Sequence, residues 1–143
     1  MTKIWTLTAD GSRARIFLTH GMEQDLEEVK SFVNPLGRAK DGELREDAQG
    51  RFAGKGEPMH SMAPRVDQPE KERDEFARML GQYLGQARME QRYDKLRLAA
   101  APKFLGMLRE HLDKEVQKLV FEELNEDISK LDARQVQSRL AAH

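Results

Sequence analysis

The residues whose types best suit binding chemistry lie together between Gly50 and Ala63. This stretch sets three basic side chains against a single acidic one, namely Arg51, Lys55 and His60 against Glu57. Its glycines leave backbone N–H groups accessible, and its two methionines offer apolar contact that adapts to an irregular surface. The composition favours docking against a charged, irregular partner such as RNA, and a solvated loop is the alternative that it leaves open. With one arginine from upstream, the candidate contact residues are Arg38, Arg51, Gly54, Lys55, Gly56, His60 and Met62.

This stretch belongs to a longer segment, Asn34 to Pro64, that has neither a helical nor a strand period. The segment holds five of the ten glycines and three of the five prolines. A compact domain of 143 residues rarely contains a structureless connection of this length, and such a connection is usually functional or disordered. We expect a long loop at about residues 34–66.

Other kinds of chemical site find little support in the sequence. The chain has no cysteine, which excludes disulfides, thiol catalysis and Cys-ligated zinc. Its four histidines are scattered and form no H-x₃-H pair, so we expect no metal site. Neither a phosphate-binding G-x-x-x-x-G-K-[ST] loop nor a G-x-S-x-G elbow is present, and the acidic run at residues 122–127 is typical of a solvated face. We therefore expect a protein with no catalytic residues and no cofactor.

Length and charge limit the number of domains and the kinds of partner that the chain could have. A chain of 143 residues is most simply one domain, spanning residues 1–143. Its 24 Lys and Arg against 25 Asp and Glu argue against a surface coated in positive potential for nonspecific nucleic-acid binding, but they permit a local basic patch. Polar residues interrupt the apolar ones within residues 1–17, and no apolar run approaches the ~20 residues that span a bilayer. We expect a cytoplasmic protein without membrane insertion.

The first third of the chain has the period of β-strands. Residues 4–9 alternate in character, a turn signal follows at Asp10-Gly11-Ser12, and a second strand pattern covers residues 14–19. Together they predict a hairpin. Residues 26–34 fit either a third strand or a short helix, and the short spacing after the hairpin favours a strand.

After the long segment the period becomes helical. One apolar stripe predicts a helix from about Pro69 to Tyr93, formed by Phe76, Met79, Leu80, Tyr83, Leu84 and Ala87. We expect Pro69 to open this helix, with the acidic residues that follow it opposing the positive end of the helix dipole. Two interior glycines, Gly81 and Gly85, are expected to let the helix lie close against the sheet.

The rest of the chain alternates strands with helices. A strand near 95–101 precedes a helix with Pro102 in its first turn, a short helical turn leads into a strand near 119–124, and Asp132 is placed to cap a final helix. Such alternation implies parallel pairing with right-handed crossovers, so the predicted class is α/β with a mixed sheet. The expected core contains Trp5, Leu7, Ile16, Leu18, Leu96 and Leu98 from the sheet, with Phe76, Leu80, Tyr83 and Leu84 from the helix.

Four stretches of the chain carry a resemblance to a known family. They are "WTLTADGSRARIF", "NPLGRAKDGELREDAQGRF", "MHSM" and "DKLRLAAAPKFLGMLREHL". Together, from about Ile4 to Leu140, they resemble the bacterial host attachment proteins, which are named for a proposed role in attachment to host cells. That family is grouped with bacterial relatives of the archaeal and eukaryotic peptide-chain release factors.

The resemblance implies a fold and a function. The middle domain of those release factors, shared with Pelota-like rescue factors, is a five-stranded mixed sheet flanked by helices, with a long loop after three early strands. In a true release factor that loop carries Gly-Gly-Gln, whereas the corresponding stretch here reads Gly54-Lys55-Gly56-Glu57. The resemblance therefore implies a non-enzymatic factor associated with the ribosome or RNA. The alternative is the attachment role in the family name, at the cell envelope, and an enzyme of unrecognised type is a third hypothesis.

Overall fold

The computed structural model describes residues 2–21, 25–35 and 62–142, with residues 62–68 described by their backbone alone. A five-stranded sheet has the order β3-β2-β1-β4-β5. Its strands are β1 (Ile4–Ala9), β2 (Arg13–Thr19), β3 (Glu27–Val33), β4 (Lys95–Ala100) and β5 (Val120–Leu124). The helices are α4 (Met62–Met89), α5 (Pro102–His111), α6 (Lys114–Leu119) and α7 (Ala133–Ala142). The predicted class, an α/β fold with a mixed five-stranded sheet, is confirmed.

Strand pairing follows from the connections. β1 and β2 form the predicted antiparallel hairpin, because the Asp10 carboxylate accepts hydrogen bonds from the backbone N–H groups of Ser12 (2.7 Å) and Arg13 (2.8 Å) in the turn. β3 adds to β2 in the antiparallel sense, which confirms the strand at residues 27–33. The segments with helical crossovers pair in parallel, β1 with β4 and β4 with β5, as their alternation with helices predicted.

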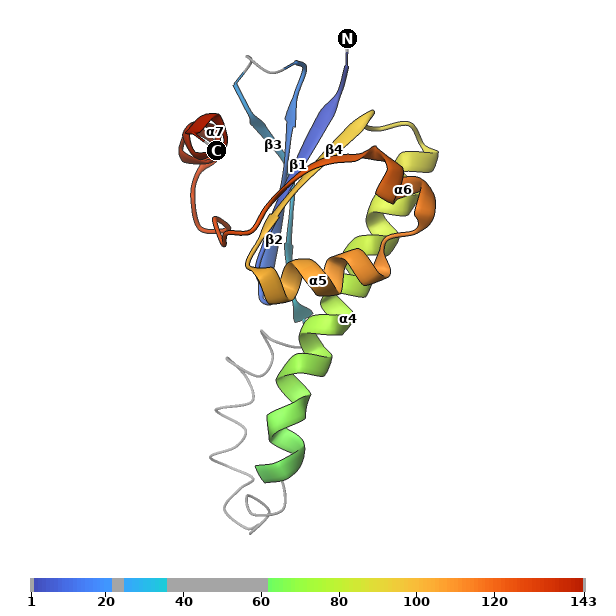
Figure 1. Cartoon of the computed structure of the whole chain (residues 1–143), viewed down its shortest axis with the longest axis vertical. Helices are drawn as coiled ribbons and strands as arrows, with labels where there is room; N and C mark the ends of the chain where they lie inside the picture. Colours follow the sequence, from blue (N-terminus) through green and yellow to red (C-terminus); the bar gives the residue numbers. More distant parts are fainter. Residues whose placement is uncertain (1, 22–24, 36–61, 143) are drawn as a thin grey trace.

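Helices cover the two faces of the sheet unequally. α4, α5 and α6 lie on one face and α7 lies on the other (Figure 1). The larger core, under α4 and α5, contains the predicted residues Trp5, Leu7, Ile16, Leu96 and Leu98. Trp5 stacks there on the ring of Tyr93, with ring centroids 4.8 Å apart. The smaller core, under α7 and the chain that follows β5, contains Phe17, Leu26, Ala99, Leu124, Ile128 and Val136.

The helical stripe of α4 is confirmed, with Phe76, Leu80 and Leu84 buried and Tyr83 packed against them. Two details of the prediction are wrong. Pro69 does not open the helix, since α4 begins at Met62 and contains Pro69 in its interior. A proline there removes a single hydrogen bond to the preceding turn and need not end the helix. The acidic residues after Pro69 accordingly lie beyond the first helical turn.

The interior glycines of α4 face other helices, and their predicted contact with the sheet is wrong. A Cβ atom at Gly81 would lie 2.4 Å from the carbonyl oxygen of His111, and one at Gly85 would lie 3.3 Å from the Asp113 carboxylate. These residues form the junction between α5 and α6. The glycines therefore permit close helix–helix packing on the sheet, where a methyl group at Gly81 could not fit without a shift.

The last helix begins as predicted. The Asp132 carboxylate accepts from the backbone N–H of Gln135 (2.8 Å), and the Gln135 side chain accepts from the backbone N–H of Asp132 (3.0 Å). This reciprocal pair is a capping box. Among the described residues, no helix combines the length and apolar character needed to cross a membrane.

Candidate functional site

One edge of the sheet gathers the ends of four strands. β1 and β3 both run antiparallel to β2, and β4 and β5 run parallel to β1, so these four strands finish at the same edge. In open α/β sheets, ligands bind outside the carboxyl ends of the strands. At this edge lie the β1–β2 turn, the end of β3, the start of α5 and the turn after β5. Asn34 and Pro35, the described residues that directly follow β3, lie at the same edge.

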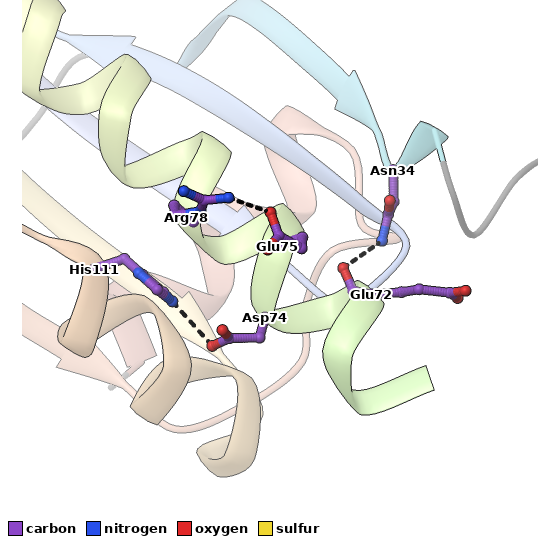
Figure 2. Close-up of polar contacts among 6 residues, drawn as sticks. All are labelled: Asn34, Glu72, Asp74, Glu75, Arg78 and His111. Carbon is purple, nitrogen blue, oxygen red and sulfur yellow. Dashed lines mark hydrogen bonds and ion pairs between the residues drawn. The ribbon is translucent and has the colours of Figure 1, made fainter. Parts of the chain in front are cut away.

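Asn34, directly after β3, connects three parts of this edge. Its side chain is buried, with 2% of the residue exposed. The side-chain amide donates to the carbonyl oxygen of Gly11 in the β1–β2 turn (2.9 Å) and to that of Glu72 in α4 (3.3 Å). Its backbone N–H donates to the carbonyl oxygen of Ser12 (2.8 Å). Asn34 therefore fixes the end of β3 to the hairpin turn and to α4, and Figure 2 shows its contact with Glu72.

Arg73 closes the same contact from α4. A Cβ atom at Gly11 would lie only 2.1 Å from Cδ of Arg73, so the arginine stem lies directly against the glycine. A side chain at this position would displace that stem. We call Gly11, Asn34, Glu72 and Arg73 the clamp, because together they hold the end of β3, the β1–β2 turn and α4 at one point.

The other side of α4 is held by α5. The imidazole Nε2 of His111 lies 2.9 Å from the Asp74 carboxylate, and Figure 2 shows the two side chains pointing toward one another. Lys103, in the first turn of α5, forms an ion pair with Glu70. The hydrogen bond and charge of Lys103 lower the pKa of the Glu70 carboxyl. Residues 70–74 of α4 are thus held on two sides, by contacts with Asn34 and with α5.

The part of α4 that precedes these contacts, from Met62 onward, extends away from the sheet. The first turns of the helix project past the edge where the strands end, while its second half packs on the sheet (Figure 1). Met62 is the first residue of this projecting part.

The predicted contact residues are not placed by the structure. Arg38, Arg51, Gly54, Lys55, Gly56 and His60 lie outside the described residues. Met62 begins α4, and its side chain is also outside them. Their role as a binding surface remains a prediction.

Sequence reasoning did not find the clamp. The contacts of Asn34 span 23 residues to Gly11 and 38 residues to Glu72, which no local pattern encodes. The available signal was modest, namely an asparagine directly after a strand pattern and before a proline. Within the described part of the chain there is no group of three or more His, Cys, Asp or Glu residues placed to hold a metal ion. The clamp is a positioning device built from backbone carbonyls, an amide and an arginine stem.

Comparison with known proteins identifies the family. A family model described as "Protein required for attachment to host cells" matches residues 5–140. The chain belongs to this family. A comparison of this host attachment family member with curated proteins finds no significant match.

Two solved structures resemble the family member in part. One is the crystal structure of an archaeal translation termination factor, with 14% identity, 98% of this chain and 38% of that chain covered, and a TM-score of 0.49. The other is the type II variant of the Aquifex aeolicus Ppx/GppA phosphatase, with 13% identity, coverage of 87% and 36%, and a TM-score of 0.41. The chain spans less than two fifths of either structure.

Proposed function

We propose that this host attachment family member is a non-enzymatic factor that binds the ribosome or RNA through the 34–61 segment and the start of α4. The observation that carries the proposal is the clamp. Its Asn34–Glu72 hydrogen bond closes a stretch of 38 residues at a single point. Closing a long connection costs conformational entropy, and a buried amide with two carbonyl acceptors offsets part of that cost. A fold that fixes the start of a long segment against the helix that follows the segment is suited to presenting it.

The chemistry of the presented segment supports a nucleic-acid partner. Arg51 and Lys55 are phosphate-binding side chains, and the neighbouring glycines allow the backbone to approach a ligand closely. The sequence resembles the release-factor relatives described above, whose corresponding loop enters the ribosome. The absence of Gly-Gly-Gln from the sequence supports a role in binding without catalysis.

A second candidate is a role in attachment to host cells, acting at the cell envelope. The observation that favours it is the family match itself, because the description of that family names attachment and covers residues 5–140. The two candidates predict different locations for the same chain.

Fractionation of cells that express the full chain separates them. Lysates are resolved into ribosomal, envelope and free-protein fractions, and the chain is followed through each. The proposal expects the chain in the ribosomal pellet, with release by ribonuclease treatment. Recovery in the envelope fraction, unchanged by ribonuclease, supports attachment and overturns the proposal, as does recovery of the whole pool as free protein.

A further inference from the structure

β3 is an outer strand of the sheet. It pairs with β2 on one side, and no other strand of the described chain lies beside it. All of its residues except Phe32 are exposed. Two of these are valines, with 39% of Val29 and 48% of Val33 accessible to solvent. Apolar side chains on an unpaired outer strand favour pairing with a strand of another chain.

The backbone of β3 offers hydrogen-bonding groups on its outer side. Asn34, directly after the strand, donates its backbone N–H inward to the carbonyl oxygen of Ser12 (2.8 Å). Along an antiparallel pair, residues that bond the partner strand alternate with residues that do not. The N–H and C=O groups of Val33 and Ser31 therefore point away from β2. They belong to a regular stretch, because the register shift of the β2–β3 pair lies before Lys30.

Charged side chains commonly protect an outer strand from pairing, and β3 has three of them, Glu27, Glu28 and Lys30. Two of the three are engaged by neighbours within the chain. Nζ of Lys30 lies 5.8 Å from the centre of the Phe32 ring, and the Glu28 carboxylate lies 3.8 Å from the Arg15 guanidinium. These contacts direct both charges toward the faces of the sheet, so they leave the outer side of β3 unprotected.

We propose that β3 pairs with β3 of a second copy of this chain in the antiparallel sense, with Ser31 at the two-fold axis. In this register Val29 lies opposite Val33 of the second copy, and the symmetry of the dimer produces this pair twice. Lys30 lies opposite Phe32 of the second copy, and no two like charges face one another. Cross-strand pairs of this kind stabilise a sheet. β3 is thus complementary to itself, which a two-fold interface requires.

Other symmetric pairings fit less well. Centring the pair on Lys30 would place two lysines opposite one another, and like charges at that position are destabilising. Centring it on Val29 would put the register shift of both strands at the axis, where it disrupts the ladder. Centring it on Phe32 would separate the valines. At the opposite side of the sheet, two β5 strands paired about Glu122 would bring carboxylates together.

Cross-linking through an introduced cysteine tests the pairing directly, because the chain has no cysteine of its own. In the proposed register the Cα atoms of the two Ser31 residues are about 5.5 Å apart, which is within the range of a disulfide. The full chain with Ser31→Cys should therefore form a covalent dimer under mild oxidation. Glu27→Cys is the matched control on the same exposed strand. Its two copies are about 25 Å apart along the paired strands and should stay unlinked.

Sedimentation velocity on the full chain measures the affinity. The wild type should show a reversible and weak dimer, since one strand from each copy forms a small interface. Val29→Glu and Val33→Lys should each raise the dissociation constant by about tenfold or more, because each places a charge against a valine. Combining the two substitutions sets opposite charges across the interface and should recover part of the affinity. Met89→Lys, at a residue of α4 that is 67% exposed, is the control and should dimerise as the wild type does.

Three results would overturn the proposal. One is a wild type that sediments as a monomer up to about 1 mM, where association is too weak to measure. Another is equal cross-linking of Ser31→Cys and Glu27→Cys, because the chains then meet by chance or elsewhere. The third is a combined variant that dimerises no better than Val29→Glu or Val33→Lys alone, because the two positions are then not opposite one another. The inference stands whether or not the protein binds RNA.

Discussion

The side-chain amide of Asn34 donates to the carbonyl oxygen of Glu72 across 38 residues of chain, at 3.3 Å. The same amide donates to Gly11, so one buried side chain serves two backbone acceptors on different elements. Asn34→Ala leaves both carbonyls without this donor. We expect a loss of about 1–3 kcal/mol in the free energy of unfolding, measured by urea denaturation. Asn34→Asp, which cannot donate, should lose at least as much, and a loss below about 0.5 kcal/mol in both variants would contradict the role of the clamp.

Gly81 and Gly106 give a matched pair of substitutions with opposite signs. A Cβ atom at Gly81 would lie 2.4 Å from the carbonyl oxygen of His111, whereas one at Gly106 in α5 meets nothing within 4 Å. Alanine is preferred over glycine inside a helix by about 1 kcal/mol. Gly106→Ala should therefore raise the midpoint of urea denaturation, and Gly81→Ala should lower it because α4 and α5 must separate. Stabilisation by both substitutions would show that the helices do not approach as closely as described.

Tyr93 links stability to alkaline pH. Burial raises the pKa of its phenol well above the ordinary value of 10, and the hydroxyl donates to the carbonyl oxygen of Leu84 (2.8 Å). The group stays protonated in the folded chain at a pH where it ionises in the unfolded chain. Its contribution is therefore fully present below pH 10 and is lost as the pH rises further. The free energy of unfolding should fall above pH 10, and the fall should be shallower in Tyr93→Phe. An unchanged slope in that variant would contradict the burial of this hydroxyl.

The sequence accounts for most of the fold and little of the site. Period-2 and period-3.6 patterns located the strands and helices, because burying one face constrains many residues at once. The same logic failed at Pro69, since a helix tolerates one missing hydrogen bond when the turn before it still forms. It also failed at Gly81, where the period marks a face of α4 but does not say which element packs there. The clamp could not be predicted from the sequence, because Asn34, Gly11 and Glu72 come together only once the sheet has formed.

We predict no hydrolysis of peptidyl-tRNA by this chain. Release needs a residue that positions water at the ester carbonyl, and the release factors that the sequence resembles use a glutamine after two adjacent glycines. Glu57 stands here instead, and its charge is repelled by RNA phosphates, while Lys55 separates the two glycines. The measurement is release of labelled peptide from stalled ribosomes at high protein concentration. Release above background that disappears in Glu57→Ala would make the protein an enzyme.

The most direct test of the central claim is co-sedimentation of the purified chain with ribosomes at increasing salt. If Arg38, Arg51 and Lys55 contact three phosphates, affinity should fall roughly 20- to 40-fold between 50 and 200 mM salt. Replacing all three with alanine should weaken binding at low salt and flatten this dependence. The control variant replaces three exposed lysines, Lys114, Lys118 and Lys130, with alanine and so removes the same charge. Its affinity for ribosomes should depend on salt as that of the wild type does. Binding that does not change with salt, or a triple variant of the segment that binds as well as its control, would contradict the account.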